Sequence, residues 1–201
     1  MNRIVLLVSV GMVMGAASAA AHSVSYTQRT TAGGEIIDSY VVVHDDQMRV
    51  ETTVKGQSTV VIKNSQGTFS YMPAQHMAMK IPDRSSTQQP VEHPDNYLEA
   101  LARYQAHRVG AETIDGHPCD VYEWTTPEGT SRVWIWTEQK LPIRVEVKDP
   151  QGRMVISIIS DVQLEVPAPA SLFELPPGVS VMDTDSLMQN VQGLMQQDEK
   201  R

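Results

Sequence analysis

The sequence predicts a mainly β protein built on one large, strongly curved antiparallel sheet. β-Rich runs follow one another through most of the chain, separated by turn signals that contain Gly, Pro, Asn or Asp. The short connections indicate antiparallel neighbours, because parallel strands need long crossovers. We expect about eleven strands, at residues 24–31, 36–44, 48–54, 58–63, 68–72, 75–81, 107–114, 119–125, 131–137, 143–148 and 154–164.

Two segments outside these strands carry helical signals. Residues 82–94 are polar and Pro-rich, which is typical of a loop, and residues 95–106 then place apolar side chains at helical spacing. A second apolar stripe at helical spacing lies in residues 184–196, before a charged end. The side chains expected to pack these helices on the sheet are Leu98, Leu101, Leu187, Val191 and Leu194.

The first residues have the pattern of a secretory signal peptide. Arg3 supplies a positive charge, residues 4–17 are apolar or small, and small residues at 16–21 offer cleavage points. We therefore expect an exported, periplasmic protein. The expected divisions are a signal peptide at 1–21, a β domain at 22–178, and a C-terminal helix with a charged tail at 179–201.

Composition excludes several functions. The 201 residues contain 16 Lys and Arg against 24 Asp and Glu, a formal net charge of −8, whereas nucleic-acid binding relies on clustered basic side chains. We find no zinc-type histidine pair, phosphate loop, dinucleotide fingerprint or nucleophile elbow. We therefore expect neither an enzyme nor a bound cofactor. The single cysteine, Cys119, lies in a β-rich run and is expected to be a buried, unmodified thiol, with a reactive thiol or an intermolecular disulfide as the alternative.

Aromatic and methionine side chains recur with the two-residue spacing of a strand. Residues 131–137 alternate Trp with Val and Ile, so the tryptophans share one face of the strand and the aliphatic side chains share the other. A strand that is apolar on both faces is covered on both faces, and strongly curved sheets commonly hold ligands. We take the tryptophan face as the ligand side, with an ordinary two-layer core as the alternative. The candidate ligand-binding residues are Tyr71, Met77, Met79, Tyr122, Trp124, Trp134 and Trp136.

The segment 72–79 also permits a soft-metal hypothesis. Met72, His76, Met77 and Met79 offer thioethers and an imidazole, and thioethers select Cu(I). On a regular strand, however, His76 points away from Met77 and Met79. Flexible apolar filling by the methionines is the alternative.

A series of short motifs in the second half carries a family resemblance. The motifs are Glu112–Tyr122, Arg132–Trp136, Leu141–Arg144, Gly152, Asp161–Val162 and Leu172–Gly178. Together they resemble the exported LolA-like superfamily, which includes the outer-membrane lipoprotein carriers and related periplasmic lipid-binding and sensor domains. The resemblance implies an incomplete β-barrel of about eleven strands with one or two helices covering its concave face, and a concave face that binds acyl chains. The family's carriers use an arginine to hold a closed state; Arg49 corresponds by position only, and we assign it no role.

These observations lead to one functional expectation and two alternatives. The chain is expected to be a periplasmic binding protein that carries a lipid, an acyl chain or a lipoprotein in an apolar concavity. The first alternative is a sensor or interaction domain that binds a protein partner, such as a membrane-associated protein. The second is soft-metal (copper) binding through residues 72–79.

Overall fold

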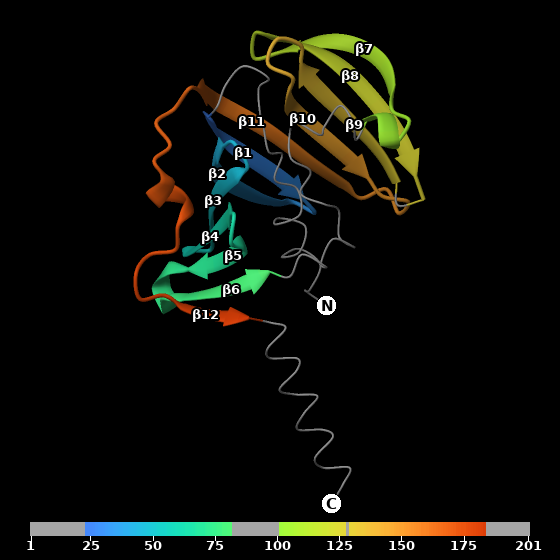
Figure 1. Cartoon of the computed structure of the whole chain (residues 1–201). Coiled ribbons are helices and arrows are strands. Elements are labelled where there is room, and N and C mark those ends of the chain that lie inside the picture. The colour runs from blue at the N-terminus through green and yellow to red at the C-terminus, as the bar shows by residue number, and fades with distance from the viewer. Residues whose placement is uncertain (1–22, 82–100, 128, 184–201) are drawn as a thin grey trace, which may run out of the picture.

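The computed structural model describes residues 23–81, 101–127 and 129–183, and their strands form one curved, open sheet (Figure 1). The twelve strands lie in the order β12-β6-β5-β4-β3-β2-β1-β11-β10-β9-β8-β7. Their bounds are β1 (Ser23–Ala32), β2 (Glu35–His44), β3 (Gln47–Val54), β4 (Gln57–Asn64), β5 (Gly67–Met72), β6 (Met77–Ile81), β7 (His107–Ile114), β8 (His117–Thr126), β9 (Gly129–Trp136), β10 (Leu141–Lys148), β11 (Met154–Leu164) and β12 (Ser180–Asp183). The predicted fold class is confirmed.

Two antiparallel meanders make up the sheet. Strands β1 to β6 form the first and β7 to β11 the second, and the pairing of β1 with β11 joins them. All these pairs are antiparallel, and for consecutive strands within each meander the short connections predict this. β12 is the exception, because it pairs in parallel with β6.

All eleven predicted strands are present with boundaries within two residues of those expected, and one strand, β12, was not predicted. Residues 75 and 76 were expected in a strand, but Pro73–Gln75 form a 3-10 turn (η1) and His76 has a left-handed φ of 51°. Pro73 at the start of the turn explains the difference, because proline lacks the N–H that a strand ladder uses. β12 was not predicted, since four residues after a Pro-Pro-Gly sequence carry little periodicity.

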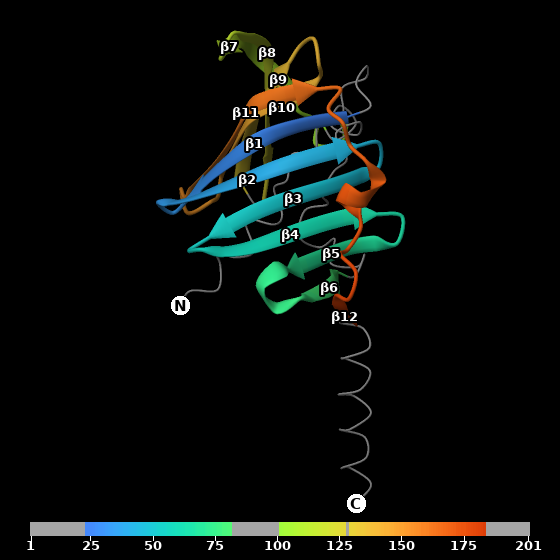
Figure 2. The same ribbon diagram turned by 90° about the vertical axis from the view of Figure 1, so that its left-hand side faces the viewer.

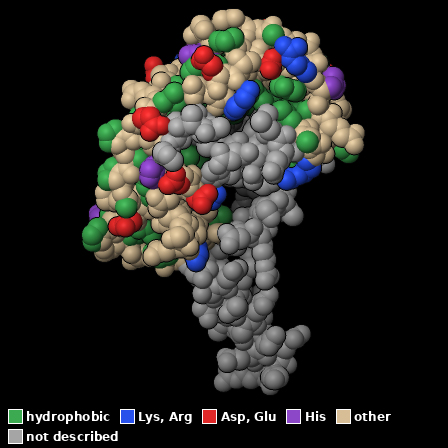
Figure 3. All heavy atoms as spheres, turned by 45° about the horizontal axis from the view of Figure 1, so that its top comes forward, with side chains coloured by type: hydrophobic (Ala, Val, Ile, Leu, Met, Phe, Trp, Pro, Cys, Tyr) green, Lys and Arg blue, Asp and Glu red, His purple; other side chains and the backbone are tan. Residues whose placement is uncertain are grey.

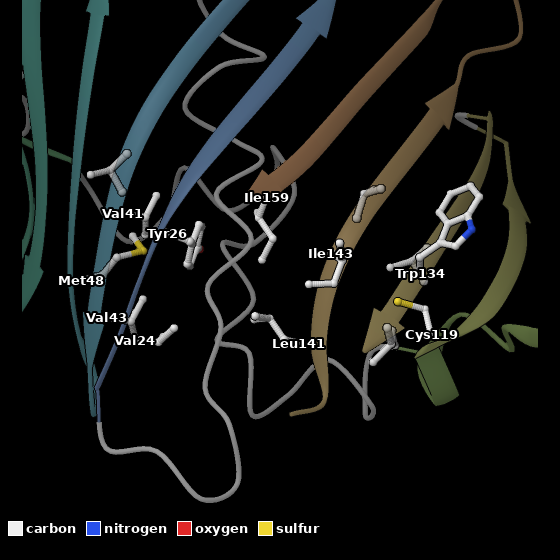
Figure 4. Close-up of a cluster of buried hydrophobic side chains, with 14 of the residues drawn as sticks. Val24, Tyr26, Val41, Val43, Met48, Cys119, Trp134, Leu141, Ile143 and Ile159 are labelled. Carbon is white, nitrogen blue, oxygen red and sulfur yellow. The ribbon is translucent and has the colours of Figure 1, made fainter. Parts of the chain in front are cut away.

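Alternation along the strands gives the sheet two faces. The concave face carries Val24, Tyr26, Val41, Val43, Val133, Val145 and Ile159, as the paired registers require. The outer face carries Val42, Ile62, Tyr71, Val121, Trp134 and Arg144. Figure 4 shows side chains of β1 and β2 pointing toward Leu141, Ile143 and Ile159 of the second meander, and all of these belong to one buried cluster.

A segment after β11 packs on the outer face of the first meander. We call residues 165–179 the strap; it contains a second 3-10 turn, η4 (Ala170–Phe173). Figure 2 shows it passing the ends of the first meander's strands before it reaches β12 beside β6. Phe173 is fully buried in a second apolar cluster with Val42, Val60, Ile62, Tyr71 and Ala78.

Several predicted segments lie outside the described residues. These are the signal peptide at 1–21, the loop at 82–94, most of the helix at 95–106 and the helix at 184–196. Within the described part, residues 101–103 are helical, and Leu101 is buried in the cluster of the concave face, as expected. Among the described residues, no helix is both long enough and apolar enough to span a bilayer.

Candidate functional site

The candidate site is the concave face, because it joins both meanders in one apolar surface. On the first meander it is formed by Val24 and Tyr26 of β1, with Val41 and Val43 of β2 opposite them. Each strand alternates, so the two-residue spacing of β-branched and aromatic side chains puts them all on one side. The tertiary structure buries them: Tyr26 and Val41 have no exposed surface.

A few polar groups interrupt the concave face near its centre. Ser157 of β11 and Thr30 of β1 are buried, and their hydroxyls hydrogen-bond at 2.9 Å. Gln28 donates through Nε2 to Thr30 Oγ1 at 3.3 Å. Tyr26 differs, because its buried hydroxyl has no hydrogen-bond partner among the described residues. Burial raises the pKa of Tyr26, so the hydroxyl keeps its proton and remains a donor.

Four of the seven predicted ligand-binding residues lie on the concave face. Met77 and Met79 belong to β6, and Tyr122 and Trp124 belong to β8. The registers place both pairs on the same side as Tyr26. The two pairs lie near opposite ends of the sheet order, so the structure does not bring them together.

The other three predicted residues lie on the outer face. Val121 pairs with Trp134 and Tyr122 pairs with Val133, so Trp134 and Trp136 face away from Tyr122 and Trp124. Tyr71 packs in the cluster around Phe173. The spacing correctly placed each pair on one face, but nothing in the sequence fixes which pairs share a face, because that depends on register between strands.

Trp134 is held in a polar setting on the outer face. Its Nε1 donates to Glu112 Oε2 at 2.9 Å, and the guanidinium of Arg144 lies 5.0 Å from its ring centroid. The guanidinium of Arg132 also lies over the ring, at 5.9 Å from its centroid. The side-chain stems of the two arginines cover the ring, which is only 4% exposed. The expectation that this strand is covered on both faces is confirmed, since Val133 and Ile135 are also buried.

Sequence reasoning missed two aromatic residues of the concave face. Tyr26 was not selected, although its spacing from Val24 is the same signal that selected the methionines. Tyr104 follows the helical residues 101–103 and stacks on Trp124 with ring centroids 5.8 Å apart. Tyr104 lies three residues after Leu101, at helical spacing within the predicted segment 95–106, so that spacing could have found it.

Arg49 contacts the strap instead of the concave face. Its register with Val42 and Ile62 places it on the outer face. There its Nη1 donates to the carbonyl of Leu172 at 3.1 Å, and its Nε pairs with Glu51 at 2.7 Å. Arg49 therefore fixes the strap to β3.

Cys119 is buried, as expected. Its thiol donates to the carbonyl of His117 at 3.3 Å. Burial is the main cause that raises the pKa of this thiol. The group is therefore kept from the thiolate form that metals and electrophiles need.

Charged side chains of both signs are mixed among hydrophobic ones on the face of the described surface that Figure 3 shows. Many are paired across strands, such as Arg29 with Asp38 at 2.7 Å and Arg132 with Glu123 at 2.6 Å. Within residues 23–81, 101–127 and 129–183, no group of three His, Cys, Asp or Glu side chains could hold a metal ion.

A family model identifies the chain. The model of the MucB/RseB N-terminal domain matches residues 13–179, which includes all of β1 to β11 and the strap. The chain belongs to the MucB/RseB N-terminal domain family. This domain has the LolA-like fold, so the resemblance in the sequence motifs is confirmed.

Solved structures share the fold of this MucB/RseB domain at low sequence identity. An uncharacterized conserved protein from Thermus thermophilus is 12% identical, with a TM-score of 0.60 over 82% of this chain and 91% of that one. A structure of MucB is 13% identical, with a TM-score of 0.54 over 80% of this chain and 60% of that one. A chain in the Pseudomonas aeruginosa MucA/MucB complex is 15% identical, with a TM-score of 0.52 over 75% of this chain and 54% of that one.

The chain thus spans little more than half of the MucB chains it resembles. At these identities the comparison shows the fold alone. A search of curated protein sequences found no match.

Proposed function

We propose that this chain is an exported, periplasmic binding domain without catalytic activity, and that it holds the acyl chain of a lipid or lipoprotein on its concave face. The observation that carries the proposal is the apolar surface continuous across both meanders, with the hydroxyl of Tyr26, which has no partner among the described residues, at its centre. Apolar walls with few polar groups suit a flexible chain. A donor without a partner suits an ester or carboxylate oxygen at the head of that chain, because an unpaired buried hydroxyl is costly otherwise.

Access to this face requires a conformational step. Tyr26, Val41 and Val133 are completely buried in this structure, so an acyl chain can touch them only after contacts over the face have opened. Binding should therefore be slower than diffusion and should reach a limiting rate set by opening. Met77 and Tyr122 are only partly buried, and we propose them as the first points of contact at either end of the face.

A fluorescent fatty-acid probe tests the proposal. The protein is stripped of lipid, and the probe is titrated into the wild type and into Met77→Ser, Tyr122→Ala and Tyr26→Phe variants. We expect saturable binding that each variant weakens several-fold. Tyr40→Ala is the matched control, because Tyr40 is an exposed tyrosine on the outer face, and it should bind as the wild type does.

Two results would contradict the acyl-chain proposal. One is the absence of saturable binding by stripped, folded protein. The other is an equal loss in Tyr40→Ala, which would mean that the probe adsorbs to exposed aromatic surface. Mass spectrometry of organic extracts from gently purified protein supplies independent evidence, since a carrier should retain some of its lipid.

Binding of a protein partner is the second candidate function. It is favoured by the solved structure of a MucB in complex with the periplasmic part of MucA, to which this fold is similar. Isothermal titration of this chain with that MucA segment tests the candidate directly. A measurable affinity that the fatty-acid probe does not reduce would place the partner on a surface other than the concave face.

A further inference from the structure

Four methionines gather on the concave face at the β12 end of the sheet. Met72 of β5 lies opposite Met77 of β6, and Met79 of β6 lies opposite Met182 of β12. Met77 and Met79 are two residues apart on one strand, so they point to the same side. The register therefore collects thioethers from three neighbouring strands, although Met182 is about a hundred residues from the others in sequence.

The spacing of these residues suits a shared ligand. Neighbouring strands lie about 4.8 Å apart, and residues two positions apart on a strand are separated by about 6.7 Å. Met77, Met79 and Met182 thus form a small triangle of backbone positions. Methionine is unbranched and flexible, so three sulfurs on such a triangle can turn toward one point above the sheet.

The patch formed by these four methionines is open to solvent and uncharged. Met79 is 37% exposed, and Met72, Met77 and Met182 are partly exposed. The residues that pair with Met79 and Met77 from the flanking strands are Ser70 and Ser180, which carry no charge. A monovalent cation at this place would therefore not be repelled by these neighbours.

We propose that Met77, Met79 and Met182 form a thioether site for a soft monovalent cation, Cu(I), with Met72 as an additional sulfur beside Met77. Thioethers are soft ligands that select Cu(I) over harder divalent ions. Carboxylate, imidazole and thiolate clusters that would favour zinc or calcium do not occur in the described part of the chain.

The site differs from the one that the sequence suggested. His76 follows η1 directly and has a left-handed backbone conformation, so it does not share the strand alternation of Met77 and Met79. Its side chain is exposed. The third sulfur comes instead from β12, which was not predicted as a strand. Because Met182 belongs to the last described strand, cation binding would also tie β12 to β6.

Silver(I) is the probe for the test, because it mimics Cu(I) and does not change its oxidation state. The full chain is titrated calorimetrically with Ag(I) in wild-type form and with Met79→Leu, Met182→Leu and the Met77/Met79/Met182 triple leucine variant. We expect one strong equivalent in the wild type, at least a tenfold weaker affinity in each single variant, and loss of that equivalent in the triple variant. Met154→Leu is the control and should match the wild type, because Met154 is exposed on β11 outside the patch.

NMR of the methionine methyl groups shows directly which methionines bind Ag(I), so a loss of binding can be distinguished from a loss of folding. Leucine substitutions conserve volume and should leave the melting temperature within a few degrees. In the wild type, Ag(I) should shift the three methyl signals that are absent from the triple leucine variant, and should leave the signal of Met154 in place. The proposal is overturned if the wild type binds no Ag(I), if the triple variant keeps the strong equivalent, or if the shifted signals belong to other methionines.

Discussion

Replacing Phe173 by alanine should reveal how strongly the strap stabilises the sheet. Phe173 is fully buried in the outer-face cluster. Truncation of a buried phenylalanine costs about 3–5 kcal/mol, which combines the lost transfer free energy with the cavity left behind. For a domain of this size, each kcal/mol lowers the melting temperature by about 2–4 °C, so Phe173→Ala should melt about 6–20 °C lower.

Three hydrogen bonds should keep the loss in free energy of unfolding near the low end of the range of about 3–5 kcal/mol. Asn64 Nδ2 donates to the carbonyl of Phe173 at 2.8 Å, and Arg49 Nη1 donates to that of Leu172 at 3.1 Å. Ser23 Oγ donates to the carbonyl of Val166 at 2.7 Å. These bonds involve backbone carbonyls of the strap, so they survive the substitution and keep the strap on the sheet.

Thermal melting followed by circular dichroism measures the shift in melting temperature, and urea unfolding followed by the same signal measures the change in the free energy of unfolding. Ser171→Ala is the matched control, because Ser171 lies in the same turn with an exposed side chain, and it should stay within about 0.5 kcal/mol of the wild type. A loss below about 1 kcal/mol in Phe173→Ala would refute the reasoning. It would mean that the strap contributes little to the free energy of unfolding and that Phe173 fills a site which collapses without cost.

Three further predictions concern single residues. Gly129→Ala should lower the melting temperature strongly, because Gly129 has a φ of 142° and an added Cβ would lie 2.2 Å from the carbonyl oxygen of Lys148. Gly110→Ala is the control in the same thermal melt, because an added Cβ there would meet no atom within 4 Å. Tyr26→Phe should raise the free energy of unfolding by about 1 kcal/mol, since it removes a buried hydroxyl that has no partner in the described part of the chain. A fall of that size in urea unfolding would mean that the hydroxyl has a partner. Maleimide labelling of Cys119 should be slow in native protein and stay slow up to pH 8, because a raised pKa leaves less thiolate at each pH; labelling as fast as in 8 M urea would contradict this.

The strands could be predicted because local signals specify them. Val41 and Val43 alternate with polar or outward residues, and Gly33-Gly34 ends the first run, with φ values of 58° and 86° that glycine adopts without strain. Strand existence, antiparallel order and the curved sheet follow from such patterns. β12 was not predicted because its pairing with β6 depends on the path of the strap, which no local sequence pattern encodes.

The candidate site was predicted only in part, for a related reason. Two-residue spacing correctly grouped Tyr122 with Trp124 and Trp134 with Trp136. Which group turns inward depends on register between strands, and a shift of one residue exchanges the faces. The pairing of Val133 with Tyr122 settles the question in the structure, but both faces of β9 are apolar, so hydrophobicity alone gave no direction.

The first meander has strands from the second half of the chain along both of its edges. β11 covers β1 on one side, and β12 covers β6 on the other. Each covering strand lies about a hundred residues or more beyond its partner in the sequence, so both are synthesised long after β1 to β6. Until then the nascent meander presents two rows of unpaired backbone amides and carbonyls, which are templates for pairing between chains. The risk of aggregation should therefore be greatest for chains that end before residue 154, and such truncated chains should need a chaperone to remain soluble.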